Sequence, residues 1–207
     1  MGLRVDRLIL GAMGTNCYIV SDDDKVFVID PGDEAHFLLK EIGNRHIEFI
    51  LLTHGHIDHI MALNEIKDRI DTNIYISELD KDMLYDPKKN LSYFLGENYV
   101  YKYDVKTLKD NDEIFFNNHR IKVIHTPGHT PGGLSFYVDN FLFSGDTLFR
   151  MSVGRTDFPG GDYIKLIKSI RERLFVLPSD TIVYPGHMEE TTIGFEKNNN
   201  PFLIWNY

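Results

Sequence analysis

Three histidines and one aspartate lie within six residues of this sequence, directly after the apolar run at residues 49–52. They are His54, His56, Asp58 and His59. Imidazole and carboxylate groups bind zinc, iron and manganese. A ligand cluster at the end of a buried strand is held by the sheet while its side chains face a crevice. We therefore predict a metal site, against the alternative of a solvated or purely structural histidine run.

The spacing within this cluster divides it into two pairs. His54 and His56 lie two residues apart, so extended backbone places both on one face. Asp58 and His59 fall where the chain turns into a helix, which is indicated by the apolar spacing of Ile60, Leu63, Ile66 and Ile70. The two pairs can point at two neighbouring ions.

Three later segments supply further candidate ligands. Strand-like runs over residues 121–125, 141–144 and 180–184 each end shortly before a glycine and a ligand-type residue. Those residues are His129, Asp146 and His187. A preceding glycine lets the backbone turn sharply or approach an ion closely. Ligands from distant segments can share one site only if their strands end at the same edge, which is what we expect here.

The order of these residues resembles the metallo-β-lactamase superfamily. The resemblance implies an α/β fold, a four-layer αββα sandwich with a dinuclear site at the edge of two sheets. It implies that one metal is held by His54, His56 and His129, that the other is held by Asp58, His59 and His187, and that Asp146 bridges them. Two divalent ions are expected, zinc first, with iron or manganese as alternatives.

Within that superfamily, several stretches resemble the glyoxalase II branch: residues 15–18, 30–32, 126–132, 145–149 and 154–162. The ending over residues 192–203 is similar to short bacterial and archaeal members of the branch. This resemblance implies a single domain over 1–207 without the helical C-terminal domain that binds glutathione in full-length glyoxalase II. Two departures, at Ile60-Met61-Ala62 and at Met188, replace glycines that are common in relatives and put the shape of the substrate pocket in doubt.

The resemblance also implies a reaction. A metal-bridging hydroxide, held at Asp58 and Asp146, is expected to attack a small acyl thioester such as S-D-lactoylglutathione. Metal coordination lowers the pKa of water from ~15.7 towards ~7. A thiol with a pKa near ~8.5 leaves as thiolate, so no strong general acid is required.

Composition limits the other classes of function. The chain has 207 residues, 43% hydrophobic and 26% charged, which is ordinary for one globular enzyme domain. The net charge of -9 argues against a nucleic-acid partner. No apolar run reaches the ~18 residues of a membrane span, and no signal peptide is recognisable, so a cytoplasmic location is expected. The oligomeric state is left open.

Residues around the ligands have expected supporting roles. Asp30 either orients a ligand imidazole or caps a turn. Arg155 and Asp157 are expected to pair and brace the loop after Asp146. The single cysteine, Cys17, is expected to be a buried structural thiol in a reducing compartment. The other histidines are expected on the surface or in packing: His36, His46, His119 and His125.

The region over residues 77–108 is rich in aromatic side chains. They are Tyr85, Tyr93, Phe94, Tyr99, Tyr101 and Tyr103. One interpretation is a helical excursion that covers the edge of the core; the other is a lid or substrate wall, because loops over α/β sites often carry specificity.

The same candidate ligands are also consistent with other functions. A persulfide dioxygenase branch resembles this chain but uses one iron, held by the counterparts of His54, His129 and Asp146. A lactone or ester hydrolase would use the same ligands, whereas a bridging Asp146 argues against a β-lactamase. A non-catalytic scaffold stabilised by metal is the remaining alternative.

Overall fold

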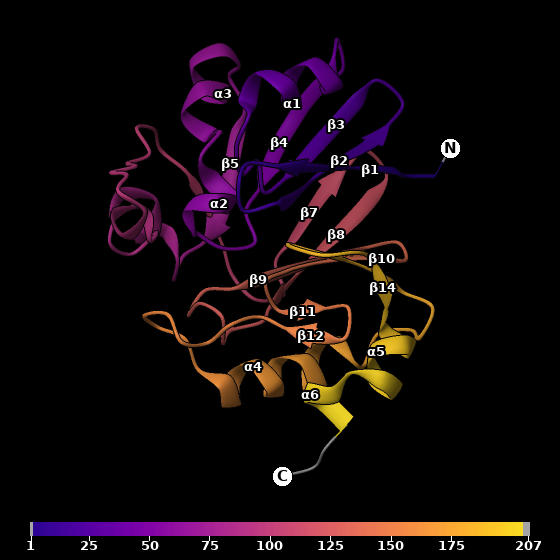
Figure 1. Cartoon of the computed structure of the whole chain (residues 1–207). Helices are drawn as coiled ribbons and strands as arrows, with labels where there is room; N and C mark the ends of the chain where they lie inside the picture. The colour runs from indigo at the N-terminus through magenta and orange to yellow at the C-terminus, as the bar shows by residue number, and fades with distance from the viewer. Residues whose placement is uncertain (1, 205–207) are drawn as a thin grey trace. The chain divides into compact units, whose positions relative to one another are not determined.

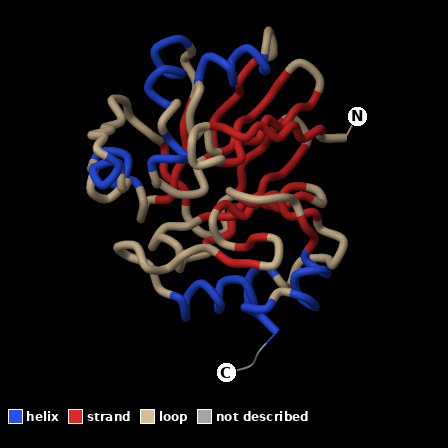
Figure 2. The backbone as a smooth tube through the Cα atoms, viewed as in Figure 1, coloured by secondary structure: helices blue, strands red, loops and turns tan. Residues whose placement is uncertain are grey.

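The computed structural model describes residues 2–204, and the chain divides into two compact units that meet in sequence between Leu108 and Lys109. Figure 1 colours the first unit from indigo through magenta and the second from rose through orange to yellow. Each unit contains a six-stranded sheet and its own helices, seen as red and blue segments in Figure 2.

The first unit has its strands in the order β1-β2-β3-β4-β5-β6. Its strands are β1 (Arg4–Leu10), β2 (Thr15–Asp22), β3 (Lys25–Ile29), β4 (His46–Leu51), β5 (Asn73–Ser77) and β6 (Lys106–Leu108). Its helices are α1 (Ala35–Ile42), α2 (Ile57–Ile60), α3 (Leu63–Arg69) and the 3-10 turns η1 (Lys81–Tyr85) and η2 (Ser92–Leu95). The first three strands form an antiparallel meander, and β3 to β6 run parallel.

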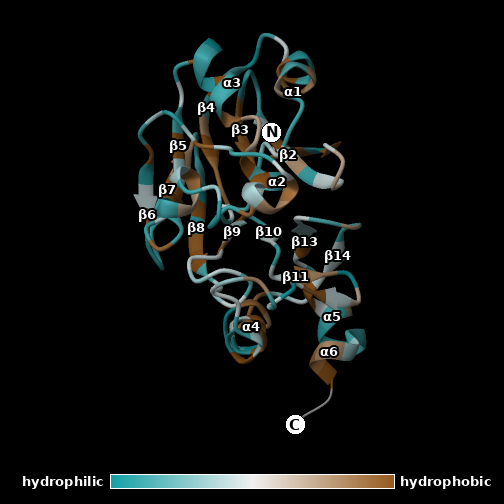
Figure 3. Ribbon diagram, turned by 60° about the vertical axis from the view of Figure 1, so that its left-hand side comes forward, coloured by the Kyte–Doolittle hydropathy of each residue, from teal (hydrophilic) through white to brown (hydrophobic). Residues whose placement is uncertain are grey.

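The core of the first unit forms where α1 and α3 pack on one face of this sheet. Val28 and Ile50 from the sheet join Leu38 from α1 and Leu63 from α3 in one buried cluster. Figure 3 shows apolar residues of β3 and β4 in brown and polar residues of the helices in teal. The helices are amphipathic, with their apolar residues in the core. The parallel strands β3 and β4 therefore end at the same edge, which is where the sequence places Asp30 and His54.

The helix predicted from Ile60 to Ile70 is divided in the structure into α2 and α3. The amide of Met61 donates to the carbonyl of Gly32 at 3.2 Å, and the amide of Ala62 donates to that of Pro31, also at 3.2 Å. Both amides are therefore used by another loop instead of by the preceding helical turn. The predicted helix is therefore confirmed as α3 over Leu63–Arg69, and α2 is a separate turn before it, which apolar spacing alone does not show.

The second unit has its strands in the order β14-β13-β10-β9-β8-β7, with a separate hairpin of β11 and β12. Its strands are β7 (Glu113–Phe116), β8 (His119–His125), β9 (Leu134–Val138), β10 (Phe141–Gly145), β11 (Leu148–Phe149), β12 (Ser152–Val153), β13 (Ile182–Pro185) and β14 (Thr191–Thr192). Its helices are α4 (Tyr163–Ser169), a π-helical turn η3 (Ile170–Leu174), α5 (Ile193–Asn199) and α6 (Pro201–Ile204). Strands β8, β10 and β13 run in the same direction, because β9 is antiparallel to both of its neighbours and β10 is parallel to β13.

The core of the second unit joins one face of its sheet to the helices. Leu142 and Val183 from the sheet pack with Leu166, Ile170 and other residues of the helices. The chain forms α4 and η3 in succession over residues 163–174, and two further helices, α5 and α6, follow. These two are short, and α5 begins at a side-chain cap in which Thr192 accepts from the amide of Phe195, so neither carries a long apolar stripe.

Among residues 2–204, no helix combines the length and the apolar character needed to cross a bilayer.

Candidate metal centre

The candidate ligands of the first unit follow strand β4. His56 is the extended N-cap residue of α2, with φ -69° and ψ 149°, so the chain turns from strand-like to helical conformation between the two predicted pairs. Donor atoms within each of the pairs His54–His56, His54–His59 and Asp58–His59 lie within 4.8 Å of one another. The six-residue cluster therefore gathers its four side chains as the sequence predicted.

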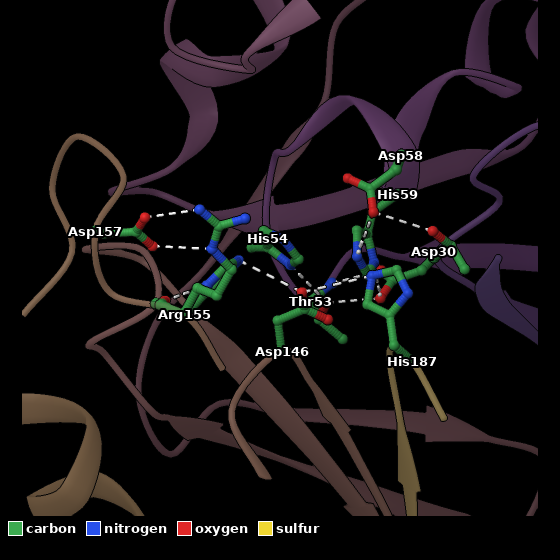
Figure 4. A network of polar contacts seen from close by, with 11 residues as sticks. Asp30, Thr53, His54, Asp58, His59, Asp146, Arg155, Asp157 and His187 are labelled. Carbon is green, nitrogen blue, oxygen red and sulfur yellow. Dashed lines mark hydrogen bonds and ion pairs between the residues drawn. The ribbon is translucent and has the colours of Figure 1, made fainter. Parts of the chain in front are cut away.

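Asp30 fixes the orientation of two of these imidazoles. Its Oδ2 accepts from Nδ1 of His59 at 3.0 Å and from the hydroxyl of Thr53 at 2.6 Å. Because the Thr53 hydroxyl donates its proton to Asp30, Thr53 Oγ1 acts as the acceptor for Nδ1 of His54, 3.1 Å away. Both imidazoles therefore carry their proton on Nδ1 and present Nε2 as the ligand atom. Figure 4 shows this network, and it confirms the interpretation that Asp30 orients a ligand imidazole.

Asp58 is positioned by residues from the start of the chain. The hydroxyl of Thr15 donates to Oδ2 of Asp58 at 3.0 Å, and that same oxygen lies 3.4 Å from Nε2 of His59. The backbone of Asp58 is held equally closely, since a Cβ on Gly32 would lie 1.9 Å from the carbonyl oxygen of Asp58. Only glycine fits this position.

The candidate ligands of the second unit meet at one edge of its sheet. They follow β8, β10 and β13, whose carboxyl ends lie at the same edge because these strands run in the same direction. Oδ2 of Asp146 lies 3.6 Å from Nε2 of His129 and 3.6 Å from Nε2 of His187. Asp146 thus stands between two imidazoles, as a bridging ligand must.

His129 is oriented by a backbone group. Its Nδ1 donates to the carbonyl of Arg155 at 2.7 Å, which again leaves Nε2 as the ligand atom. The side chain of Arg155 forms a two-pronged pair with Asp157, at 2.9 and 2.6 Å, and lies 4.4 Å from the ring centre of Phe158. Hydrogen bonding to Arg155 holds the pKa of the Asp157 carboxyl below its usual range. The predicted pairing is confirmed, and Figure 4 shows it; bracing of the loop stays a prediction.

A second close glycine contact holds the backbone of Asp146. A Cβ on Gly154 would lie 1.8 Å from the carbonyl oxygen of Asp146 and 3.5 Å from Cβ of His129. The hairpin of β11 and β12 therefore returns directly against the segment that carries Asp146.

The donor set fits metal ions. In the pairs His59–Asp58 and His129–Asp146, an imidazole lone pair and a carboxylate oxygen face each other at 3.4 and 3.6 Å. Two such electron-rich atoms repel unless a cation lies between them. Ligand atoms on one tetrahedral zinc ion, with bonds of ~2.1 Å, are separated by about 3.4 Å. The two nitrogen–oxygen distances therefore match the distance between two ligand atoms of one ion.

The remaining titratable residues named from the sequence serve other purposes. Burial, followed by the negative charge of Asp30, raises the pKa of the Cys17 thiol well above its usual value, so Cys17 is the structural thiol that was expected. His36 and His46 are exposed, whereas His119 pairs with Asp139 at 2.8 Å. His125 donates from Nε2 to the carbonyl of Pro131 at 3.0 Å.

The aromatic region over residues 77–108 does cover part of the core of the first unit. Tyr101 is 1% exposed within the core cluster, and Tyr85, Tyr99 and Tyr103 pack against that cluster. Tyr93 and Phe94 are exposed instead, at 53% and 67%. A role for these two rings as a substrate wall stays a prediction.

Sequence reasoning missed the groups that position the ligands without binding metal: Thr15, Thr53, Gly32, Gly154 and the carbonyl of Arg155. Threonine and glycine are frequent residues, and a carbonyl is present at every position. The sequence signal for Thr15, Gly32, Gly154 and Arg155 is membership in the stretches 15–18, 30–32 and 154–162, which the resemblance to the glyoxalase II branch had marked, and Thr53 directly precedes the ligand cluster.

Comparison with known proteins agrees with this geometry. The chain is 37% identical over 203 residues to the probable metallo-hydrolase YqgX of Bacillus subtilis, covering 95% of this chain and 96% of that protein. It is 35% identical over 208 residues to the hydroxyacylglutathione hydrolase GloC of Haemophilus influenzae, covering 97% and 98% of the two chains.

Solved structures give the same result for the fold. The BLEG-1 B3 metallo-β-lactamase is 36% identical, with a TM-score of 0.92 over 98% of this chain and 100% of that one. TTHA1623 in a di-iron-bound form is also 36% identical, with a TM-score of 0.85 over 96% of this chain and 100% of that one. The predicted α/β fold of the metallo-β-lactamase type is thereby confirmed. Residues 10–187 match the description "Metallo-beta-lactamase superfamily", and this chain belongs to that superfamily.

Proposed function

We propose that this protein is a dinuclear metallohydrolase that cleaves a small acyl thioester of the S-D-lactoylglutathione type. Membership of the superfamily supports hydrolysis, and the similarity to GloC over 97% of this chain supports a hydroxyacylglutathione-like substrate. The observation that carries the proposal is Asp146, whose Oδ2 lies 3.6 Å from the imidazoles of both His129 and His187.

The proposed ligands come from both units. One ion would be held by His54, His56 and His129, and the other by Asp58, His59 and His187, with Asp146 shared. Zinc suits the imidazole and carboxylate donors, and iron or manganese are accepted by the same set. The di-iron form of TTHA1623 shows that a relative with 36% identity takes iron.

Within this proposal, the protein's own residues have defined tasks. Asp30 accepts the Nδ1 proton of His59 directly and orients that of His54 through Thr53, so that both imidazoles would present Nε2 to an ion. The Arg155 carbonyl does the same for His129. When bound, the ions supply a water of lowered pKa and polarise the substrate carbonyl.

The substrate needs little proton transfer from the protein. A thiolate is a stable leaving group at neutral pH, because the pKa of a thiol is near ~8.5. The reaction can therefore proceed without a general acid beside the leaving sulfur. The proposed site agrees with this: Asp58 and Asp146 would bind the ions and Asp30 holds His59, so none of the three is left to act as a general acid.

The test is turnover of S-D-lactoylglutathione by protein reconstituted separately with zinc, iron and manganese, with thioester loss and dissolved oxygen followed together. Thioester loss without oxygen uptake is expected with at least one metal. Oxygen uptake with glutathione persulfide and no thioester loss would replace the hydrolase with the iron dioxygenase considered from the sequence.

A second candidate is β-lactam hydrolysis, which the similarity to the BLEG-1 B3 metallo-β-lactamase favours. Both reactions need attack on an activated carbonyl, but the position of Asp146 between His129 and His187 argues against a β-lactamase and favours the thioester. Parallel turnover of a chromogenic cephalosporin separates them: the thioester is expected to be cleaved with the higher kcat/KM, and the reverse order would favour the β-lactam.

A further inference from the structure

The segment over residues 78–105, called here the excursion, contacts the ligand-bearing helix α2. Its buried Asn90 accepts a hydrogen bond at the backbone carbonyl from the amide of Ile57, at 2.9 Å. Ile57 is the first residue of α2 and lies between two candidate ligands. The excursion therefore reaches the start of this helix.

The same excursion reaches the end of α2. The hydroxyl of Tyr99 donates to the carbonyl of Ile60 at 2.9 Å, and Ile60 is the last residue of the helix. A third contact precedes the helix, where a Cβ on Gly55 would lie 2.6 Å from Cβ of Met83. The excursion thus lies against the whole of the turn that carries the ligands.

Helix α2 needs such contacts more than a longer helix would. It has only four residues, so a single turn must hold Asp58 and His59 in place. Amides at the start of a helix and carbonyls at its end have no partner within the helix. The N-cap residue, His56, makes no side-chain cap hydrogen bond and is itself a candidate metal ligand. The capping groups must therefore come from elsewhere in the chain.

Asn90 holds the excursion in the shape that provides them. Its Nδ2 donates to the carbonyls of Met83 at 3.0 Å and Tyr99 at 3.1 Å, and its Oδ1 accepts from the amide of Ser92 at 3.0 Å. Asn90 is 0% exposed, and its side chain joins η1, which contains Met83, to the segment after η2, which contains Tyr99. The hydrogen bonds of the buried residues Asn90 and Ser92 therefore fix this part of the excursion.

We infer that the excursion is a positioning element for the metal centre: Asn90 and Tyr99 cap the two ends of α2 and so hold Asp58 and His59 in ligand geometry. The inference rests on the proposed metal-binding function and assigns positioning roles to residues outside the ligand set. A plain cover over the core would require the packing of Tyr101 but no hydrogen bonds to both ends of a ligand helix.

The chain offers a matched pair of variants. Tyr99→Phe removes the hydroxyl that caps α2, and Tyr85→Phe removes a hydroxyl of the same excursion that donates to the carbonyl of Tyr103, also at 2.9 Å. Both tyrosines are partly buried and pack on the same core cluster. A loss of general stability should therefore be similar in the two variants.

The measurement is the Kd for zinc of the full-length protein, by competition with a chromophoric chelator. Tyr99→Phe is expected to raise the zinc Kd by about 10-fold, the lower end of the effect of removing groups that support metal ligands, and Tyr85→Phe by less than about twofold. Equal changes in the two variants, or none in either, would overturn the inference and leave the excursion as a cover.

Amide hydrogen exchange in the metal-free protein gives a second readout. Tyr99→Phe should speed exchange at residues 57–61, and Tyr85→Phe should not. Asn90→Asp keeps the acceptor for Ser92 but loses both donors, so exchange at Ile57 should rise further. If the unmodified protein binds none of zinc, iron or manganese, the proposed function fails, while unequal exchange in the two tyrosine variants would still support the capping roles.

Discussion

Asp30 shows how one buried carboxylate can set the tautomer and orientation of two candidate ligands. It accepts from the amide and the hydroxyl of Thr53 and from Nδ1 of His59, at 2.8, 2.6 and 3.0 Å. Its backbone lies in the left-handed region, with φ 50°, which aspartate tolerates better than most residues. The parallel pairing of β3 with β4 brings it beside Thr53. Removal of this acceptor should disturb two imidazoles at once.

We therefore predict that Asp30→Asn raises the Kd for the bound metal by about 10- to 100-fold. The amide N–H of asparagine would face the Thr53 hydroxyl or His59 Nδ1, which are themselves donors. A buried donor left without an acceptor also lowers the free energy of unfolding by about 1–3 kcal/mol. Chelator competition and thermal unfolding measure the two effects.

Asp139→Asn is the control for that variant, because Asp139 is an exposed carboxylate that also pairs with a histidine, His119. Its effect on metal affinity should be negligible, and its effect on stability at most ~1 kcal/mol, as for other surface pairs. Equal loss of metal in both variants would refute the role of Asp30.

At the scale of elements, both candidate ligand aspartates are held by a glycine from a distant segment. Cβ positions on Gly32 and Gly154 would lie 1.9 and 1.8 Å from the carbonyl oxygens of Asp58 and Asp146. In each unit, a loop therefore packs directly on the backbone of an aspartate. Because glycine has no side chain, each loop can approach this closely and fix the position of the aspartate backbone.

Gly154→Ala should therefore push the β11–β12 hairpin away from Asp146. We expect a loss of about 1–3 kcal/mol in the free energy of unfolding, as for other overpacked sites, together with weaker metal binding. Gly2→Ala is the matched control, because a Cβ there meets nothing within 4 Å. Unchanged metal content and stability in Gly154→Ala would show that the hairpin moves without cost to the site.

Sequence patterns predicted the longer elements well. Strands β4, β8, β10 and β13 and helix α3 lie where apolar runs and spacing placed them, within a few residues. The short elements β11, β12, β14, α5 and α6 were not predicted, because two to seven residues carry too little periodicity. Their positions depend instead on tertiary contacts such as Glu196, which accepts from the amide of Met151 at 3.0 Å.

At the scale of the whole molecule, each unit has an apolar core that does not depend on metal. One cluster joins the first sheet to α1 and α3, and another joins the second sheet to its helices. Chelation should therefore lower the melting temperature without unfolding the protein at 25 °C. The size of the shift should follow RT ln(1 + [L]/Kd), and circular dichroism during titration with a chelator measures it.

Loss of structure at 25 °C on chelation would instead make the metal a requirement for folding, as the scaffold hypothesis from the sequence proposes. Loss of turnover with retained structure is the result expected for an enzyme. The two outcomes separate catalysis from a structural role of the same ligands.

The candidate ligands could be named from the sequence because histidine and aspartate at strand ends are rare enough to be noticed, and because their order resembles a known family. The groups that orient them could not be named in this way, since threonine and glycine, such as Thr53 and Gly154, are frequent residues and are not typical metal ligands. Parallel strands explain why ligands that are distant in sequence, such as Asp146 and His187, meet within one unit. A single domain over 1–207 and a cytoplasmic location stay predictions.

The most direct test of the central claim is the metal content of the reconstituted and desalted protein, measured by inductively coupled plasma mass spectrometry beside two variants. We predict two ions per chain for the unmodified protein and for His125→Ala, and the loss of at least one ion in Asp146→Ala. One ion or none in the unmodified protein, or equal loss in both variants, would contradict a dinuclear centre shared at Asp146.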